Sequence, residues 1–331
     1  VLNWRMLPNV SWAIFAQNAR RHGRPDNPAL GNFAQNVKPM TEDPMESLIN
    51  FFTTIPSGCR AAILVGGLAL FWTIESLAPL FATRYDKWRH AGLNLFFTLT
   101  TVVVNFAFAV LILRTSDWAV AHGFGLLHLV EMPLWLFLLA GLLLLDLIGA
   151  YWIHRIQHQV KWMWKFHLIH HTDTHVDATT ANRHHPGESV FRAVFTLLAV
   201  AVTGAPMWLV MLYQTLSALF SQFNHANISL PVWLDRAVSW LIVSPNMHKV
   251  HHHYAQPLTD TNYGNIFSVW DRIFGTFASV PDTRRLTYGV DTHPEPAENN
   301  RLGNLLRIPF QPYRPPAGRE KPRKTQEKPV S

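Results

Sequence analysis

Residues 126–171 read LLHLVEMPLWLFLLAGLLLLDLIGAYWIHRIQHQVKWMWKFHLIHH, an apolar run followed at once by two histidine motifs. The apolar part, residues 126–152, is long enough for a helix to cross the hydrocarbon core of a bilayer with some tilt. His154, the first of the clustered histidines, follows this run almost directly. We therefore expect a membrane helix that carries metal-binding side chains at one end.

Three further apolar stretches accompany this one. Residues 61–81 and 93–113 are each about 20 residues long, enough for a full crossing. Residues 191–223 are interrupted at Gly204-Ala205-Pro206, and each half is short for a crossing, which favours a hairpin or re-entrant pair. Residues 232–243 form an amphipathic pattern typical of a surface helix. The sequence predicts an all-α fold, a multi-pass transmembrane helical bundle.

Composition supports a membrane protein. Charged residues make up only 15% of the chain, against roughly 25% in an average soluble domain. The net charge is +7, but the basic residues lie in the polar ends and short loops rather than in a patch suited to nucleic acid. Cys59 is the single cysteine, which excludes a disulfide framework and a multi-thiolate metal site.

The chain divides into three predicted regions. Residues 1–58 are polar, show no signal-peptide pattern, and predict a short interfacial helix near 45–54. Residues 59–281 form the membrane-embedded domain. Residues 282–331 are Pro-rich and basic and are predicted to be disordered.

Positive charge predicts the orientation of the spans. The loop between the first two runs is basic, whereas only Arg114 lies between the second and third, so the basic loop is expected in the cytoplasm. The third span then returns, and His154 reaches the cytoplasmic side. The N-terminal arginines would lie outside after one crossing, so either the rule fails there or the first run is re-entrant. The basic loop holds Arg84, Lys87 and Arg89, and the N-terminal arginines are Arg20, Arg21 and Arg24.

Thirteen of the 18 histidines lie between residues 154 and 253, and core packing does not require such a cluster. On a helix, positions i, i+3 and i+4 share a face, and imidazole suits Fe, Zn, Cu and Ni. A single HxxxH is more often a pair of exposed surface histidines than a pair of metal ligands. Two HxxHH motifs in addition to it predict a dinuclear metal site on a helical cap. The motif residues are His154 and His158; His167, His170 and His171; His248, His251 and His252; and the lone His225.

Other candidate residues lie near this cluster. Asp146, inside the third run, is expected either to orient a ligand imidazole or to bond to a neighbouring helix. His184 and His185 compete for one ligand position. His175 is expected not to be a ligand. We interpret the isolated histidines as structural or solvated: His22, His90, His122, His128 and His293.

The segments around the histidines resemble bacterial-type members of the fatty acid hydroxylase/sterol desaturase superfamily of membrane di-iron enzymes. Residues 151–155 (YWIHR) are similar to the entry of its first motif, and residues 177–188 (DATTANRHHPGE) to its TT-x-x-R-x-HP-x-E segment. Residues 262–264 (NYG) and 270–276 (WDRIFGT) match further segments. Ser221 departs from the histidine that some members carry four residues before the equivalent of His225.

The resemblance implies a set of site residues. It selects His185 over His184, which gives ten expected metal ligands: the nine motif histidines and His185. Five further residues are candidates to support the ligands: Asp146, Asp177, Arg183, Glu188 and Asn262.

The resemblance also implies a reaction. Two iron ions, with zinc as a possible substitute, would use O2 as co-substrate to hydroxylate or desaturate a C–H bond of a lipid such as a fatty acyl chain or sterol. The lipid would enter from the bilayer, in this case a bacterial inner membrane. Electrons would come from an external donor, a cytochrome b5-like protein, ferredoxin or reductase, and Lys161 and Lys165 are candidates to dock it.

Two other classes of function compete with lipid oxidation. A zinc-dependent membrane hydrolase is disfavoured because the chain has no HExxH and its motifs carry no interleaved general-base Glu. A metal transporter or sensor is disfavoured because transporters usually hold ions near the membrane midplane, whereas these motifs lie at or beyond the ends of the spans.

Overall fold

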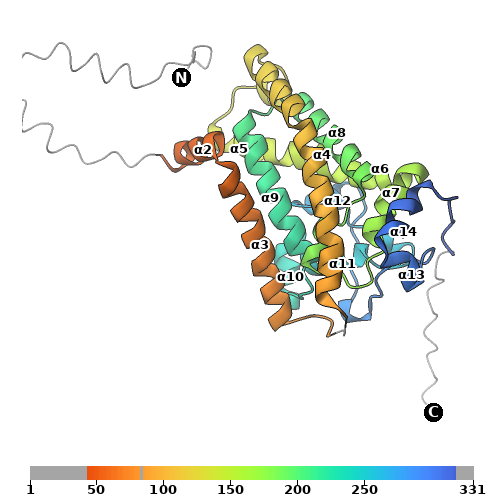
Figure 1. The fold of residues 1–331 in the computed structure, drawn as a ribbon. Coiled ribbons are helices and arrows are strands. Elements are labelled where there is room, and N and C mark those ends of the chain that lie inside the picture. The colour runs from red at the N-terminus through yellow and green to blue at the C-terminus, as the bar shows by residue number, and fades with distance from the viewer. Residues whose placement is uncertain (1–42, 83–84, 318–331) are drawn as a thin grey trace, which may run out of the picture. The chain divides into compact units, whose positions relative to one another are not determined.

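Four helical segments are long and apolar enough to cross a membrane in residues 43–82 and 85–317, the part of the chain that the computed structural model describes (Figure 1). Those described residues form no extended strand, only two isolated bridges. The predicted all-α, multi-pass architecture is confirmed, whereas the cytoplasmic side of the cap stays a prediction. The four segments are Ser57–Leu77, Lys87–His128, Leu134–Gln159 and Pro186–Thr203.

The first two spans are α3 (Ser57–Leu77) and α4 (Lys87–His122). The Asp86 side chain starts α4 by accepting a hydrogen bond from the amide of Arg89 at 3.0 Å, which satisfies a donor at the helix N-terminus. Gly123, with φ +58°, ends α4 in the left-handed conformation that glycine adopts without strain.

The third span changes helix type before it reaches the histidines. Helix α5 (Leu134–Asp146) continues into a π-helical stretch, Leu147–Trp152, and then into α6 (Ile153–Gln159). Such π segments interrupt the 3.6-residue period and are frequent at functional sites.

Asp146 does not orient a ligand imidazole. Its buried carboxylate accepts hydrogen bonds from the backbone amides of Ile266 and Phe267, at 3.3 and 3.2 Å. Of the two roles expected for Asp146, that of orienting a ligand imidazole is therefore wrong. The carboxylate instead holds the loop that follows residues 262–264 against the third span.

The fourth apolar stretch forms a helical hairpin. Helices α8 (Pro186–Thr203) and α9 (Met207–His225) are joined at Gly204, whose φ is +70°. Of these two helices, only α8 is apolar enough to count among the candidate spans. Helix α8 lies beside α4, and α9 lies beside α3 (Figure 1).

Short helices gather at the end of the bundle where α3 stops. These are α7 (Lys161–His171), the 3-10 turn Ala178–Asn182, α10 (Val232–Val238), α11 (Pro245–His251) and α12 (Val269–Ile273). The buried Glu75 carboxylate at the end of α3 accepts from the amides of Ala178 and Asn227, at 3.0 and 2.9 Å. This contact brings the segments that follow two histidine motifs to the same end as the loop between α3 and α4.

The C-terminal segment is more ordered than its composition predicts. Helices α13 (Pro296–Asn299) and α14 (Leu302–Arg307) and the turn Ile308–Phe310 pack on the bundle near α7 (Figure 1). Leu305 and Ile308 are buried in a cluster with Phe97 and Ile169. The prediction of disorder from residue 282 is wrong up to residue 317, because a few spaced apolar residues bury enough surface to fix a chain rich in Pro and charge.

Other predictions fall partly outside the described residues. A helix, α2 (Pro44–Thr54), occupies the position where a short one is expected, but its interfacial placement stays a prediction. Residues 1–42, Arg84 and residues 318–331 lie outside the described residues, so the expectations for the N-terminal arginines and the extreme tail are untested. The chain forms two units, 1–47 and 48–331, and the thirteen histidines between residues 154 and 253 belong to the second.

Candidate metal centre

Nine histidines from α6, α7, α9 and α11 converge in two neighbouring groups. The ligand atoms within each group lie within 4.8 Å of one another. The rings of His171 and His252, one from each group, stack with centroids 4.8 Å apart. The first group holds His154, His158, His167, His171 and His251, and the second holds His170, His225, His248 and His252.

Backbone carbonyls orient two rings of the first group. The Nδ1 atom of His154 lies 2.9 Å from the carbonyl oxygen of Tyr263, and Nδ1 of His251 lies 2.7 Å from that of Thr261. A proton held on Nδ1 by a carbonyl leaves Nε2 as the free lone pair. The Nε2 atoms of both rings are buried and have no hydrogen-bond partner among the described residues.

Carboxylates orient two further rings. Nδ1 of His158 lies 3.1 Å from Asp260, and Nδ1 of His167 lies 2.7 Å from the fully buried Glu188. The Nε2 atoms of these rings are also buried and unpartnered within the described chain. Carboxylate–histidine pairs of this kind fix the tautomer of metal ligands and raise their basicity.

The second group is centred on His225. Its Nε2 atom lies 3.1 Å from Nε2 of His170, 3.0 Å from that of His248 and 3.1 Å from that of His252. Nδ1 of His225 lies 2.7 Å from the carbonyl oxygen of Ser221, which fixes the proton on that nitrogen. Four ring nitrogens therefore face one point, an arrangement that a cation stabilises and that neutral rings alone do not satisfy.

Burial keeps these imidazoles in the form that binds metal. Desolvation, together with the positive charge that neighbouring rings would carry, holds the pKa values of His170, His171 and His252 well below the ordinary value. Neutral imidazole is the ligand form. The orphaned nitrogens, the fixed tautomers and the neutral charge state all fit two bound metal ions.

His185 is the one expected ligand that lies elsewhere. Its Nδ1 accepts a hydrogen bond from the amide of Gly187 at 3.0 Å and so caps α8, while Nε2 lies 3.4 Å from the carbonyl oxygen of Leu306. His184 instead lines the pocket beside the ligands, with its ring centroid 5.0 Å from that of His170. The choice of His185 over His184 is therefore wrong. Pro186 opens α8, so the residue before it takes the capping position.

Among the expected supporting residues, Glu188 contacts a ligand ring, whereas the others form hydrogen bonds with backbone groups. Asp177 caps the turn at 178–182 by accepting from the amide of Thr179 at 2.8 Å. Arg183 is fully buried and donates to the carbonyl oxygens of Ile169 and Asn299, at 3.0 and 2.6 Å.

Asn262 holds the segment after α11. With φ +55°, it donates to the carbonyl oxygens of Met247 and Ala278, each at 2.8 Å. Asn262, like Asp177 and Arg183, thus acts on the segments that carry the histidines rather than on the rings.

A small pocket opens among the metal ligands. Its volume is about 20 Å³, enough for one water-sized molecule. It is lined by five of the nine converging histidines, by His184, and by Ala150, Arg192, Ser221, Tyr263, Gly264 and Asn265. Ser221 stands where some relatives carry a histidine, and here its position borders open space. Arg192 was not expected at the site, because its sequence neighbourhood shows only an apolar helix.

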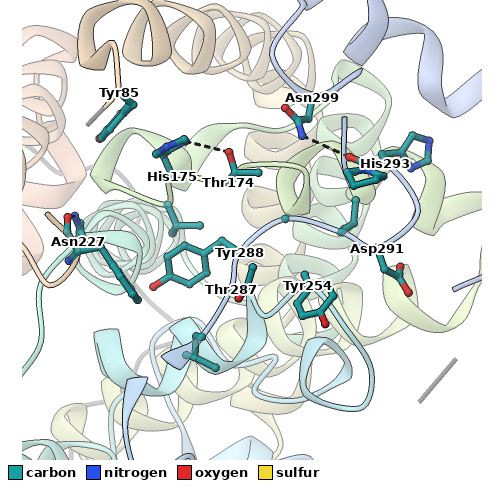
Figure 2. Close-up of a pocket in the computed structure, with 16 residues that line it drawn as sticks. Tyr85, Thr174, His175, Asn227, Tyr254, Thr287, Tyr288, Asp291, His293 and Asn299 are labelled. Atoms are coloured by element: carbon teal, nitrogen blue, oxygen red, sulfur yellow. Dashed lines mark hydrogen bonds between the residues drawn. The ribbon is translucent and has the colours of Figure 1, made fainter. Parts of the chain in front are cut away.

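A much larger cavity, about 630 Å³, lies under the segments that follow the histidine motifs (Figure 2). Its wall includes His175, Asn227 and Tyr254, which come shortly after His171, His225 and His252, and it closes on residues 286–294. As expected, His175 is not among the converging histidines, and its ring stacks on Tyr85 with centroids 4.5 Å apart. The Tyr288 hydroxyl is buried without a hydrogen-bond partner in the described chain.

Comparison with known proteins shows what the region around the centre is similar to. Residues 138–276 match the family model described as Fatty acid hydroxylase. Alkylglycerol monooxygenase of Xenopus tropicalis is 30% identical over 153 residues, 44% of this chain and 31% of that protein. Ornithine lipid hydroxylase OlsE of Rhizobium tropici is 25% identical over 161 residues, 48% of this chain and 47% of its own length.

A match to a plant protein covers a larger share of that protein's length. Methylsterol monooxygenase 2-2 of Arabidopsis thaliana is 28% identical over 168 residues, 50% of this chain and 62% of that protein. The matches to the first curated relatives thus span 31–47% of those proteins' own lengths. No solved structure matches it.

Proposed function

Because residues 138–276 belong to the fatty acid hydroxylase family, we propose that this protein is a membrane oxidoreductase that hydroxylates or desaturates a C–H bond of a lipid, using O2 and two iron ions. The named relatives that support lipid oxygenation act on alkylglycerols, ornithine lipids and methylsterols. A fatty acyl chain or a sterol is the substrate class that the family favours.

One observation carries this proposal. Nine buried histidines place their ring nitrogens in two adjacent groups, and the Nε2 atoms of the first group have no protein partner among the described residues. Unpaired buried polar atoms are costly, so a fold that gathers them needs a bound ion to compensate. The five-histidine and four-histidine groups would each hold one iron ion, and His184 is the nearest further imidazole.

When bound, iron in such a site supplies oxidation of an unactivated C–H bond by O2. The histidines act as ligands rather than as acids or bases, and Glu188 and Asp260 hold two of the rings in position. The apolar spans exclude water and admit the lipid chain from the bilayer. The small pocket beside the ligands is the place where the reacting carbon would come closest to the centre.

Electrons would come from an external protein donor on the cytoplasmic side. Lys161 is exposed at the start of α7, the helix that carries three of the histidines, and Lys165 is half-exposed one turn later. A basic surface there could attract an acidic donor. If neutralising both lysines left donor-dependent turnover and its salt sensitivity unchanged, this docking site would be rejected.

Comparative lipid mass spectrometry of cells with and without the gene tests the function. A product heavier by one oxygen means hydroxylation, and a product lighter by two hydrogens means desaturation. Identical lipid profiles under aerobic growth, with the protein expressed and iron-loaded, would contradict the proposal.

A further inference from the structure

Arg192 places a positive charge beside the metal ligands and inside a candidate span. It lies on α8, four residues after Glu188, and lines the small pocket together with five of the nine converging histidines, His184 and Ser221. Its side chain is 28% exposed, so the charge is neither fully buried nor free in solvent. A charge within a span is costly and usually faces a cavity or a partner.

The nearest acid does not satisfy this guanidinium. The closest approach between Arg192 Nη1 and Glu188 Oε1 is 3.9 Å, beyond hydrogen-bond distance. That same oxygen is already engaged by His167 Nδ1 at 2.7 Å. The guanidinium has five N–H donors, and none of them makes a hydrogen bond within the described chain. The side chain is therefore available to an acceptor that lies beside the pocket.

The position of Arg192 sets where that acceptor would lie. Four residues along a helix correspond to about 6 Å, and helical side chains lean toward the N-terminus. The guanidinium therefore reaches back toward the polar end of α8, where Glu188 and His167 meet. Arg192 lines the pocket while 28% of its side chain stays exposed, so it lies between the histidines and the surface of α8.

We propose that Arg192 binds the oxyanion of the lipid's polar group, a carboxylate or phosphate, next to the metal pocket. Arginine matches such groups with two parallel hydrogen bonds. The inference rests on the proposed function and narrows it: the oxidised C–H bond lies within a few carbons of an anionic head rather than in mid-chain. Lipids of the same length with a neutral head then bind more weakly.

The test is ligand binding to the full chain in phosphatidylcholine nanodiscs, followed by tryptophan fluorescence. The probes are hexadecanoate, hexadecyl phosphate and hexadecanol. The variants are wild type, R192Q, R192K and R114Q. Arg114 is an exposed arginine on α4 and serves as the matched control. Partitioning of each probe into the nanodisc is the same for all variants, so ratios of Kd report the side chain.

We expect R192Q to weaken binding of at least one anionic probe by about tenfold, the size of a charge-assisted hydrogen bond, and binding of hexadecanol by less than twofold. The affinity of R192K for the anionic probes should lie between those of R192Q and wild type, because lysine keeps the positive charge but cannot form two parallel hydrogen bonds. R114Q should bind like wild type. A larger loss for hexadecanoate assigns the site to an acyl carboxylate, and a larger loss for the phosphate assigns it to a phosphate head.

Equal affinity of R192Q and wild type for both anions would overturn the proposal. It is also overturned if R192Q keeps the preference for anions but loses metal or thermal stability, because Arg192 then serves only as the counter-charge of Glu188. Metal content and lipid oxidation measured on the same samples separate the two claims. An iron-loaded, active wild type without anion preference refutes only the role of Arg192, and anion preference without iron or turnover refutes only the oxygenase.

Discussion

The larger of the two cavities in this protein lacks metal ligands in its wall, whereas the much smaller one lies among them. The larger, about 630 Å³ (Figure 2), has none of the nine converging histidines in its wall. The smaller, about 20 Å³, has histidines as half of its lining residues. The small pocket lies among orphaned ring nitrogens, each of which needs a partner. The volume of a cavity shows only that side chains leave space unfilled. Buried nitrogens without a hydrogen-bond partner indicate where a bound ion is needed.

Removing one ligand should have the largest effect. His171 sits in the five-histidine group and stacks on His252 of the other group. We expect H171A to lose at least one of two metal ions and all lipid oxidation, because it removes a ligand from the five-histidine group at the point where that group meets the other. Metal content by mass spectrometry checks this result.

The matched control for that variant is H185A. His185 caps α8 and lies outside the cluster, so H185A should keep both metal ions. Loss of its helix cap should cost only about 1 kcal/mol of stability. If H185A and H171A lost metal equally, the ligand assignment would be refuted.

The buried arginine behind α7 should dominate stability rather than metal chemistry. Arg183 is fully buried and donates to Ile169, Asn299 and Asn94. R183L leaves these three buried acceptors without their donor. We expect a loss of about 3–5 kcal/mol in the free energy of unfolding. A urea-unfolding midpoint unchanged from wild type would show that the network is not needed.

Replacing Glu188 should weaken metal binding without abolishing the site. E188Q keeps an acceptor for His167 but removes the charge that raises its basicity. Loss of such a partner typically costs 10–100-fold in metal affinity. Competition with a chelator measures this change. An affinity within twofold of wild type would mean that the carboxylate does not tune the ligand.

Filling the large cavity should have the smallest effect on the metal centre. Thr287 lines that cavity (Figure 2), whose wall contains none of the nine converging histidines. T287F should leave metal affinity within about twofold, since it touches none of the nine rings. A tenfold loss would show that the two regions are coupled.

Local patterns in the sequence predict most of the spans and all nine converging histidines. Apolar length and the i, i+3, i+4 spacing are properties of a single helix, and α6, α7 and α11 present their histidines as that spacing requires. Which helices meet cannot be read from spacing alone, and His225 has no second histidine at helical spacing to mark it.

The errors arise where contacts are distant in sequence. Asp146 bonds to amides about 120 residues away, and a π-helical stretch intervenes between it and His154. His185 is drawn out of the cluster by the start of α8 and by Leu306, in a segment that composition alone marks as disordered. Arg192 carries no motif, and only its place beside the histidines reveals it.

The most direct test of the central claim is the iron content of wild-type protein purified without oxygen. Two iron ions per chain are expected, with Mössbauer or X-ray absorption spectra showing nitrogen ligation, and H171A should fall to one or none. Full lipid-oxidising activity in a sample that holds almost no iron would contradict the two-iron histidine centre.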